Sequence, residues 1–498
     1  MKLLKLVLVV FLQIYTRVSA KSPPIIIIGA GSAGIAAAAR LFENNYTNVK
    51  ILEAENRIGG RIRSVFFGEA FVDLGAESCH GTKDNVVYDL VKDFNILRHS
   101  DASNAVYYSS KKTITREFGE EIISLIDSVY GPDGHRNVVE GRSLGWYCMK
   151  KYNSTIYDKY QKNPDKLEVA KSSMDLLRHI VLDYEGAFSW FDPSAKSDYT
   201  DCEGDKQLKW NGMGYETILD ILMKKIPDPA KQLPFNQAVL LNKEVTKVLW
   251  NKNSSQNGVT VVCSDRTNYT ADHVILTTSI GVLKERQRSM FIPSLPRVKR
   301  EAIRHIGFGA VMKIALRFKT KWWEDNFSGF LLIWNESDKL RVLEEFPQGP
   351  IKRGRSWLTE LYSVYPVAHN PNVLIAWLTG EVVPEVERME EETMIPGIEY
   401  LLKKFMGHKY NISKLDAIIK TSWYSNPHFR GSYSYQTPKA RRSQVTAEME
   451  LAQPVLNKNG KPILQFAGEA THAYFYSTVH GAIETGFREA DRIINLYK

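Results

Sequence analysis

Hydrophobic and polar positions first mark out a strand–helix–strand unit near the start of the chain. Residues 25–28, four isoleucines, form the continuous apolar run that is typical of a strand buried on both faces. The alanine-rich stretch 35–42 predicts a helix, and residues 49–53 predict a second strand. Together the three segments indicate one βαβ unit of a parallel sheet.

The pattern is less regular in the middle of the chain. Residues from about 85 to 200 are mostly helical in composition, and residues 389–406 predict a helix that begins with acids. Short apolar or alternating segments predict strands at residues 259–263, 273–277, 310–318, 329–334 and 373–378. This mixture predicts an α/β protein in which a Rossmann-like domain is interrupted by an α+β domain, a mixed sheet with flanking helices.

A glycine-rich loop, GAGSAG at residues 29–34, joins the first strand to its helix. Gly29 allows the sharp turn, Gly31 lets the backbone approach a pyrophosphate, and Gly34 lets the helix pack on the sheet. Glu53, at the end of the second strand, is the acid expected to accept hydrogen bonds from a ribose. The combination predicts a dinucleotide site, and this pattern alone leaves NAD and FAD open.

The first 20 residues have the composition of a secretory signal peptide. Lys2 and Lys5 accompany an apolar run from Leu3 to Leu12, and Val18-Ser19-Ala20 forms a small-residue cleavage pattern. The run is well short of the ~20 residues that span a bilayer, so we expect no transmembrane anchor. Seven glycosylation sequons also favour a secreted or luminal, N-glycosylated chain, at Asn45, Asn153, Asn253, Asn268, Asn326, Asn335 and Asn411.

The charge and the cysteine content of the chain argue against nucleic-acid binding and against a metal site. The formal net charge of +9 falls to +6 without the three basic residues of the leader, a mild and dispersed excess that does not indicate nucleic-acid binding. The four cysteines show no CxxC spacing, so no metal site is predicted. One disulfide is possible in an oxidising compartment, but the sequence does not choose its pair among Cys79, Cys148, Cys202 and Cys263.

Further motifs distinguish the two dinucleotides. Residues 52–61, LEAENRIGGR, resemble the LEAxxRxGGR extension of the flavin amine oxidase family, and DLGA at residues 73–76 follows at the family's spacing. Near the other end, FAGEATH at residues 466–472 and YSTVHGA at residues 476–482 match the family's flavin-contact segment. The resemblance is greatest to polyamine and spermine oxidases, and it covers nearly the whole mature chain.

The resemblance implies FAD as the cofactor. Residues 431–433, Gly-Ser-Tyr, lack the cysteine that tethers flavin in monoamine oxidases, so FAD is expected to be non-covalent. The expected FAD-binding domain, of the GR2 type, comprises residues 21–110, 205–290 and 405–498, and the substrate-binding domain comprises residues 111–204 and 291–404. The residues expected to bind FAD are Gly29, Gly31, Ser32, Ala33, Gly34, Glu53, Arg61, Gly75, Ala76, Glu77, Val245, Trp423, Glu469, Thr478 and Val479.

Five residues are expected to take part in catalysis or in substrate binding. The resemblance implies that Lys313 holds a water beside the flavin, although its apolar strand also suits a solvated edge lysine. His80 matches a histidine that borders the amine tunnel, with a purely structural histidine as the alternative. Tyr433 and Thr478 match substrate-wall positions, and Thr478 also suits the N-cap of a terminal helix. Glu203 is a candidate for the acid in the tunnel, and a solvated surface acid is at least as compatible.

The expected activity is oxidation of spermine, spermidine or their acetylated forms with O2, giving an aldehyde, a shorter amine and hydrogen peroxide. Ser78-Cys79 stands where the family usually has tryptophan and an aliphatic residue, which widens one wall and leaves the substrate open. Two alternatives remain: an oxidase of other amines, and a secreted flavin- or amine-binding protein without turnover. The oligomeric state is also open.

Overall fold

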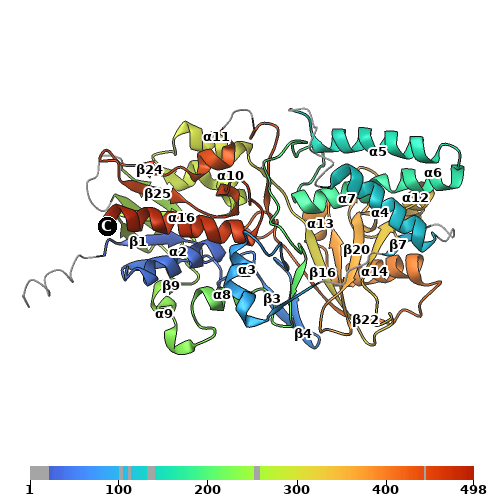
Figure 1. Cartoon of the computed structure of the whole chain (residues 1–498), viewed down its shortest axis with the longest axis horizontal. Helices are drawn as coiled ribbons and strands as arrows, with labels where there is room; N and C mark the ends of the chain where they lie inside the picture. The colour runs from blue at the N-terminus through green and yellow to red at the C-terminus, as the bar shows by residue number, and fades with distance from the viewer. Residues whose placement is uncertain (1–21, 100–104, 110–113, 132–140, 252–257, 442–444) are drawn as a thin grey trace, which may run out of the picture.

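The computed structural model describes residues 22–99, 105–109, 114–131, 141–251, 258–441 and 445–498 (Figure 1). The predicted signal peptide and the Asn253 sequon lie outside these ranges. Elements from both ends of the chain form one half of the molecule, on the left of Figure 1, and elements from the middle form the other half. Within the described part of the chain, no helix combines the length and apolar character needed to cross a membrane.

The first half is built on a six-stranded sheet in which β1 (Ile25–Ile28) lies between β2 (Val49–Leu52) and β13 (His273–Leu276), all parallel. All four residues of β1 are buried, which explains its continuous apolar run. β13 pairs in parallel with β25 (Pro462–Phe466), so the start, middle and end of the chain share one sheet. β24 (Val455–Leu456) and β9 (Val239–Leu240) form its edges.

Two helices from opposite ends of the sequence cover this sheet. α2 (Ser32–Glu43) lies beside α16 (Val479–Tyr497) (Figure 1). A Cβ atom at Gly486 would lie 2.2 Å from the Ala33 carbonyl oxygen, so only glycine allows the two helices to approach this closely. A Cβ atom at Gly34 would lie 2.1 Å from the Gly29 carbonyl oxygen, which confirms the packing role predicted for that glycine.

The second half contains a six-stranded mixed sheet. β16 (Met312–Phe318) pairs antiparallel with β22 (Leu415–Lys420) and β21 (Val373–Leu378), and β20 (Leu361–Pro366) continues the sheet. β17 (Phe330–Ile333) then pairs in parallel with the edge strand β7 (Ala105–Tyr108).

Helices cover both faces of this second sheet. Along β17, Phe330 and Leu332 pack into one core, and Leu331 and Ile333 pack into the other. The first core includes α12 (Glu336–Glu345) and α14 (Glu391–Met406). The second includes the helical region expected before residue 200: α4 (Arg116–Tyr130), α5 (Leu144–Tyr160), α6 (Pro164–Ser172) and α7 (Met174–Glu185).

The remaining elements are short. One small sheet has four strands: β10 (Val245–Trp250), β11 (Val259–Cys263), β12 (Asn268–Ala271) and β14 (Phe291–Ile292). Another has three strands: β5 (Ser78–Cys79), β6 (Leu97–Arg98) and β8 (Leu208–Trp210). The other small sheets are strand pairs: β3 (Ser64–Phe67) with β4 (Ala70–Asp73), β15 (Gly307–Phe308) with β23 (Ser434–Tyr435), and β18 (Ile351–Lys352) with β19 (Arg355–Ser356). The remaining α-helices are α3 (Val86–Val91), α8 (Thr217–Leu222), α9 (Phe235–Ala238), α10 (Ile280–Met290), α11 (Arg297–His305), α13 (Val383–Val386) and α15 (Ala447–Ala452).

Three segments lie across the predicted domain boundaries. β7 and β22 fall within the predicted FAD-binding segments 21–110 and 405–498, but both pair in the second sheet. Residues 291–305 fall within a predicted substrate segment, but β14 pairs with β10 and α11 packs into the core of the first half. The boundaries are therefore displaced at these points, because hydrogen-bonded partners distant in sequence decide which sheet a strand joins.

Candidate active site

A continuous cavity of about 2000 Å3 connects the two halves of the molecule. Its lining begins at the β1–α2 loop and extends to residues of α4 and α7. Of the 15 residues predicted to bind the cofactor, the cavity lining includes all except Gly34, which packs beneath the loop. A space of this size can hold an extended dinucleotide together with a second molecule.

The loop end of the cavity is suited to a pyrophosphate. α2 begins after Gly31 without a side-chain cap and without an acid in its first turn. Its first backbone N–H groups therefore need an acceptor, and the positive end of the helix dipole favours an anion there. Gly31, Ser32 and Ala33 all line the cavity at this point.

Glu53 is fixed in the position expected for a ribose-binding acid. Its side chain is buried, and its two oxygen atoms accept hydrogen bonds from the backbone N–H groups of Ala30 (2.6 Å) and Glu55 (2.8 Å). Burial raises the pKa of Glu53, and the two backbone N–H groups oppose that rise. The carboxyl group is thus held rigidly at the cavity wall.

Arg61 and Glu469 join the two chain ends beside the cavity. Arg61 Nη1 donates to Glu469 Oε1 at 2.9 Å and to the Ser432 carbonyl at 2.7 Å. The other Glu469 oxygen accepts from the Ser434 hydroxyl at 2.6 Å and from the Ser477 backbone N–H at 2.9 Å. One nitrogen of this arginine, which is expected to bind FAD, therefore already donates to protein groups.

The start of α16 reaches the same cavity. Thr478 Oγ1 accepts from the Gly481 N–H at 3.0 Å and donates to the Phe475 carbonyl at 2.7 Å. Thr478 and Val479 both line the cavity. Thr478 is thus the N-cap that the sequence suggested, and it presents the positive end of α16 to the cavity.

Lys313 lies on β16 with only 4% of its surface exposed. Its Nζ donates to the carbonyl oxygens of Asp73 (3.1 Å) and Gly75 (2.9 Å) and to Glu77 Oε2 (2.7 Å). It also lies 4.4 Å from the ring centroid of Trp377, its cross-strand neighbour. These three partners match the three N–H groups of an ammonium, and the expected role of Lys313 in holding a water stays a prediction.

Two acids without a predicted role line the cavity at the end of α7. Asp183 Oδ2 accepts from the Tyr362 hydroxyl at 2.7 Å, and Asp183 Oδ1 is buried with no hydrogen-bond partner among the described residues. Glu185 accepts from the Tyr130 hydroxyl at 3.2 Å. Burial raises the pKa of Asp183 to about 6 and that of Glu185 to about 7.

A signal for these acids was present in the sequence. They form Asp183-Tyr184-Glu185 directly before Gly186, which ends α7 in the left-handed conformation. Acids are unfavourable at a helix C-terminus, because the helix dipole is negative there. Two acids in that position indicate a role other than helix stability.

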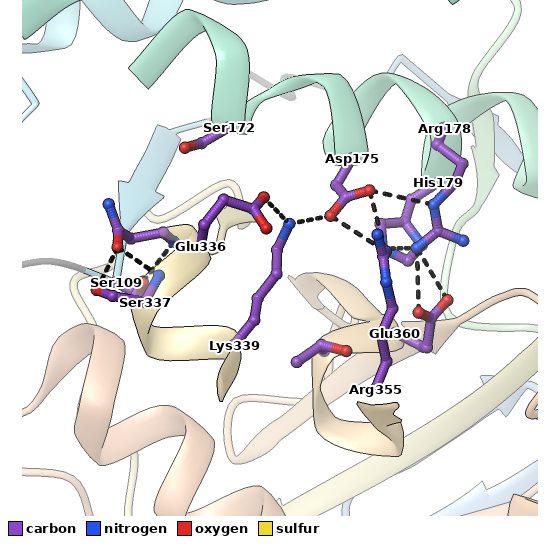
Figure 2. Close-up of polar contacts among 12 residues, drawn as sticks. Ser109, Ser172, Asp175, Arg178, His179, Glu336, Ser337, Lys339, Arg355 and Glu360 are labelled. Atoms are coloured by element: carbon purple, nitrogen blue, oxygen red, sulfur yellow. Dashed lines mark hydrogen bonds and ion pairs between the residues drawn. The ribbon is translucent and has the colours of Figure 1, made fainter. Parts of the chain in front are cut away.

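An ionic network holds the helix that carries these acids (Figure 2). Asp175 contacts Arg178 Nε (3.4 Å), Arg355 Nη1 (3.1 Å) and the Lys339 ammonium, and Arg178 Nη2 lies 3.0 Å from Glu360. Burial opposes ionisation of Asp175, but the surrounding cations hold the pKa of its carboxyl well below the usual range. The network therefore ties α7 to α12 and to the segment 355–360.

Of the remaining residues with predicted catalytic or substrate roles, two line the cavity and one does not. Tyr433 lines the cavity, and its hydroxyl donates to the Asp183 carbonyl. His80 also lines the cavity, and its Nδ1 lies 2.6 Å from the Lys206 carbonyl, so Nδ1 carries a proton and Nε2 of the neutral ring is an acceptor. Glu203 does not line the cavity: its side chain is 72% exposed and pairs with Lys83.

Comparison with known proteins agrees with this geometry. The family described as flavin containing amine oxidoreductase matches residues 32–494. The human peroxisomal N(1)-acetyl-spermine/spermidine oxidase is 27% identical over 95% of each chain. The probable polyamine oxidase 5 of Arabidopsis thaliana is 26% identical over 96% of this chain and 99% of its own length.

A redesigned triple mutant of putrescine oxidase has the same fold, with a TM-score of 0.64 and 17% identity over 95% of this chain and 99% of its own. The family implies FAD, and the uncapped α2 start, the fixed Glu53 carboxyl and the α16 N-terminus fit that cofactor. The chain belongs to the family of flavin-containing amine oxidoreductases.

Proposed function

We propose that this enzyme oxidises polyamines, namely spermine, spermidine or their acetylated derivatives, with O2 as the acceptor. The oxidised amine would be hydrolysed by one water, so the products would be an aldehyde, a shorter amine and hydrogen peroxide. FAD, when bound, would supply the redox chemistry, because it can accept a hydride from the carbon beside the amine nitrogen and pass the two electrons to oxygen. The observation that carries the choice of substrate is the pair of acids, Asp183 and Glu185, in the cavity wall.

The acids suit the charges of a polyamine. Asp183, with a pKa of about 6, is mostly ionised at neutral pH, so its negative charge at the cavity wall would attract an ammonium group. Glu185, with a pKa of about 7, would become more fully ionised when a cation binds beside it. Tyrosine rings of the same wall can contact the alkylammonium chain, and they belong to Tyr184, Tyr199, Tyr362, Tyr365, Tyr433 and Tyr476.

Other residues would orient the reacting amine. The amine must be neutral at the nitrogen beside the carbon that is oxidised, and His80 Nε2 offers an acceptor for a proton or an N–H group. Ser78 replaces the usual tryptophan, and Lys209 of β8 donates to its hydroxyl at 3.0 Å. The space that the tryptophan side chain would occupy is therefore bordered by the hydrogen bond between Lys209 and Ser78. This part of the cavity wall is polar where the family usually has an aromatic ring.

An anaerobic substrate panel tests this proposal. The FAD-loaded enzyme is mixed without oxygen with spermine, spermidine, their acetylated forms, an amino acid and an aromatic monoamine, and flavin absorbance is followed. Rapid bleaching by a polyamine and peroxide release on admitting air are expected. Bleaching by the monoamine alone would indicate an oxidase of other amines, and no bleaching by any amine would favour a binding protein.

Matched variants connect the result to the cavity acids. Asp183→Asn is expected to raise the KM for spermine at least tenfold, because it removes a negative charge from the partly buried wall of the cavity. Glu203→Gln, which alters the exposed acid outside the cavity, should leave KM unchanged. Equal effects of the two substitutions would contradict the assignment of Asp183 to substrate binding.

We also propose that the FAD is non-covalent and that the mature chain is secreted and glycosylated. All four cysteines are free and buried, and none lines the cavity, so denaturation should release all flavin into solution. Five described sequons have exposed asparagines, whereas Asn335 caps α12 and donates its amide to Tyr108. Expression in a secreting eukaryotic host, followed by glycosidase digestion and N-terminal sequencing, tests both features; intracellular retention of an intact leader would refute secretion.

A further inference from the structure

Three charged side chains form a cluster in the cavity wall, which we call the Lys209–Glu77–Lys313 cluster. Glu77 Oε1 accepts from Lys209 Nζ at 2.6 Å, and Glu77 Oε2 accepts from Lys313 Nζ at 2.7 Å. The side chains are 28% (Lys209), 26% (Glu77) and 5% (Lys313) exposed, and all three residues line the cavity. The carboxylate is thus shared between two ammonium groups.

The strand register explains why Lys209 reaches this position. β5 and β8 pair antiparallel with Ser78 directly opposite Lys209. The lysine side chain therefore passes Ser78, donates to its hydroxyl, and reaches the neighbouring Glu77. No motif of the family marks Lys209, so the sequence alone gave it no role.

The charge balance of the cluster gives Lys209 a specific effect. Without Lys209, the Glu77 carboxylate would neutralise the Lys313 ammonium, and the cluster would have no net charge. With Lys209, the three groups together carry one positive charge at a partly buried wall, where charges act more strongly than in water. The nearby Asp73 carboxyl bonds to the Ser64 hydroxyl and the Tyr215 N–H and forms no hydrogen bond to the cluster, although the Lys313 charge acts to lower its pKa against the rise that burial causes. Removal of Lys209 still changes the local charge by one.

We infer that Lys209 is a charge-setting residue that, by sharing the Glu77 carboxylate with Lys313, leaves a net positive charge on the cluster and thereby makes the bound flavin easier to reduce. The positive charge stabilises the electrons that the flavin gains, just as a cation stabilises any developing anion in a preorganised site. Lys209 acts through Glu77 and Lys313 and is thus a positioning residue. The inference rests on FAD binding by the family and does not depend on the amine being a polyamine.

Sulfite affinity and the flavin midpoint potential test the inference, because neither requires an amine substrate. Sulfite is an anion that bleaches oxidised flavin, and its binding strengthens with positive charge nearby. For Lys209→Met we expect sulfite binding weaker by about tenfold, since one charge is removed from a partly buried site. The midpoint potential should fall by roughly 30 mV, the equivalent of tenfold for a two-electron couple.

Three further variants separate charge from structure. Lys209→Arg keeps the charge and should stay within about twofold of the wild type in sulfite affinity. Lys206→Met removes a lysine of the same cavity that is paired with Asp201 at 2.6 Å, and it should have little effect. Glu77→Gln removes the negative charge, so it should shift sulfite affinity in the direction opposite to Lys209→Met.

An unchanged potential and sulfite affinity in Lys209→Met would overturn the inference. A shift of the same sign in Glu77→Gln and Lys209→Met would also overturn it, because that pattern indicates a packing effect instead of a charge effect. If Lys209→Met does not retain FAD, Lys209→Gln provides the same charge change with a polar side chain and is judged by the same outcomes. Failure of the polyamine panel with intact potential shifts would reject the substrate proposal alone.

Discussion

The ionic network beneath α7 gives a stability prediction that can be worked from its geometry. Asp175 is 19% exposed and contacts Lys339, which is 8% exposed, and Arg178, which is 17% exposed. Replacing Asp175 by Asn leaves these cations without their shared carboxylate. Removing one partner of a buried ion pair costs about 3–5 kcal/mol.

The expected cost is lower here. Lys339 keeps Glu336 as a partner, Arg178 keeps Glu360, and Arg355 is 41% exposed and can be solvated. We therefore expect Asp175→Asn to lower the free energy of unfolding by about 2–3 kcal/mol. For a domain of about 150–250 residues that unfolds cooperatively, this free-energy loss corresponds to a fall in Tm of roughly 5–10 °C.

Thermal unfolding of the FAD-loaded enzyme measures this effect, with Glu336→Gln as the matched control. Glu336 contacts the same Lys339 but is 74% exposed, so its loss should cost less than about 1 kcal/mol. Because the pKa of Asp175 is lowered in the folded state, its contribution is complete above the pKa of the unfolded chain, about 4. The difference between wild type and Asp175→Asn should therefore be constant from pH 6 to 8. A loss below 1 kcal/mol, or equal losses in the two variants, would refute the reasoning.

Other predictions concern the cavity. Because the Asp183 carboxyl has a pKa of about 6, the KM for a polyamine should rise as pH falls through 6, and the corresponding step should disappear from the pH profile of Asp183→Asn. Gly34→Ala should abolish FAD binding and lower Tm, because its Cβ would lie 2.1 Å from the Gly29 carbonyl oxygen; normal flavin content would contradict this. Thr478→Ala should lose about 1 kcal/mol of stability with its N-cap, and Thr478→Ser should restore it in denaturant titrations.

The parts of the fold that depend on local pattern could be predicted from sequence. The isoleucine run became β1, the glycine loop led into α2, and Glu53 took its place at the cavity because each depends on neighbours within about 30 residues. The strand predicted at residues 373–378 matches β21. In each case the pattern of residues close in sequence was sufficient to predict the element.

The parts that depend on distant partners could not be predicted. Arg61 and Glu469 pair across 408 residues, and β22 joins a sheet whose other strands precede it by dozens of residues. Glu203 is the sequence-based candidate for the tunnel acid, but its side chain is exposed at the surface, whereas Asp183 lines the cavity. Neither outcome follows from periodicity, because sheet partners and cavity walls are set by the assembled fold.

The contact between α2 and α16 has a consequence for how the protein is made. More than 430 residues separate these two helices in the chain. At about 5–20 residues per second, a ribosome needs roughly 20–90 s to add α16 after α2 has been synthesised. Throughout that interval the part of the α2 surface that α16 covers lacks its permanent partner, although β1, β2 and α8 are already available to pack against the rest of the helix. The cofactor site can form only after the last helix has left the ribosome.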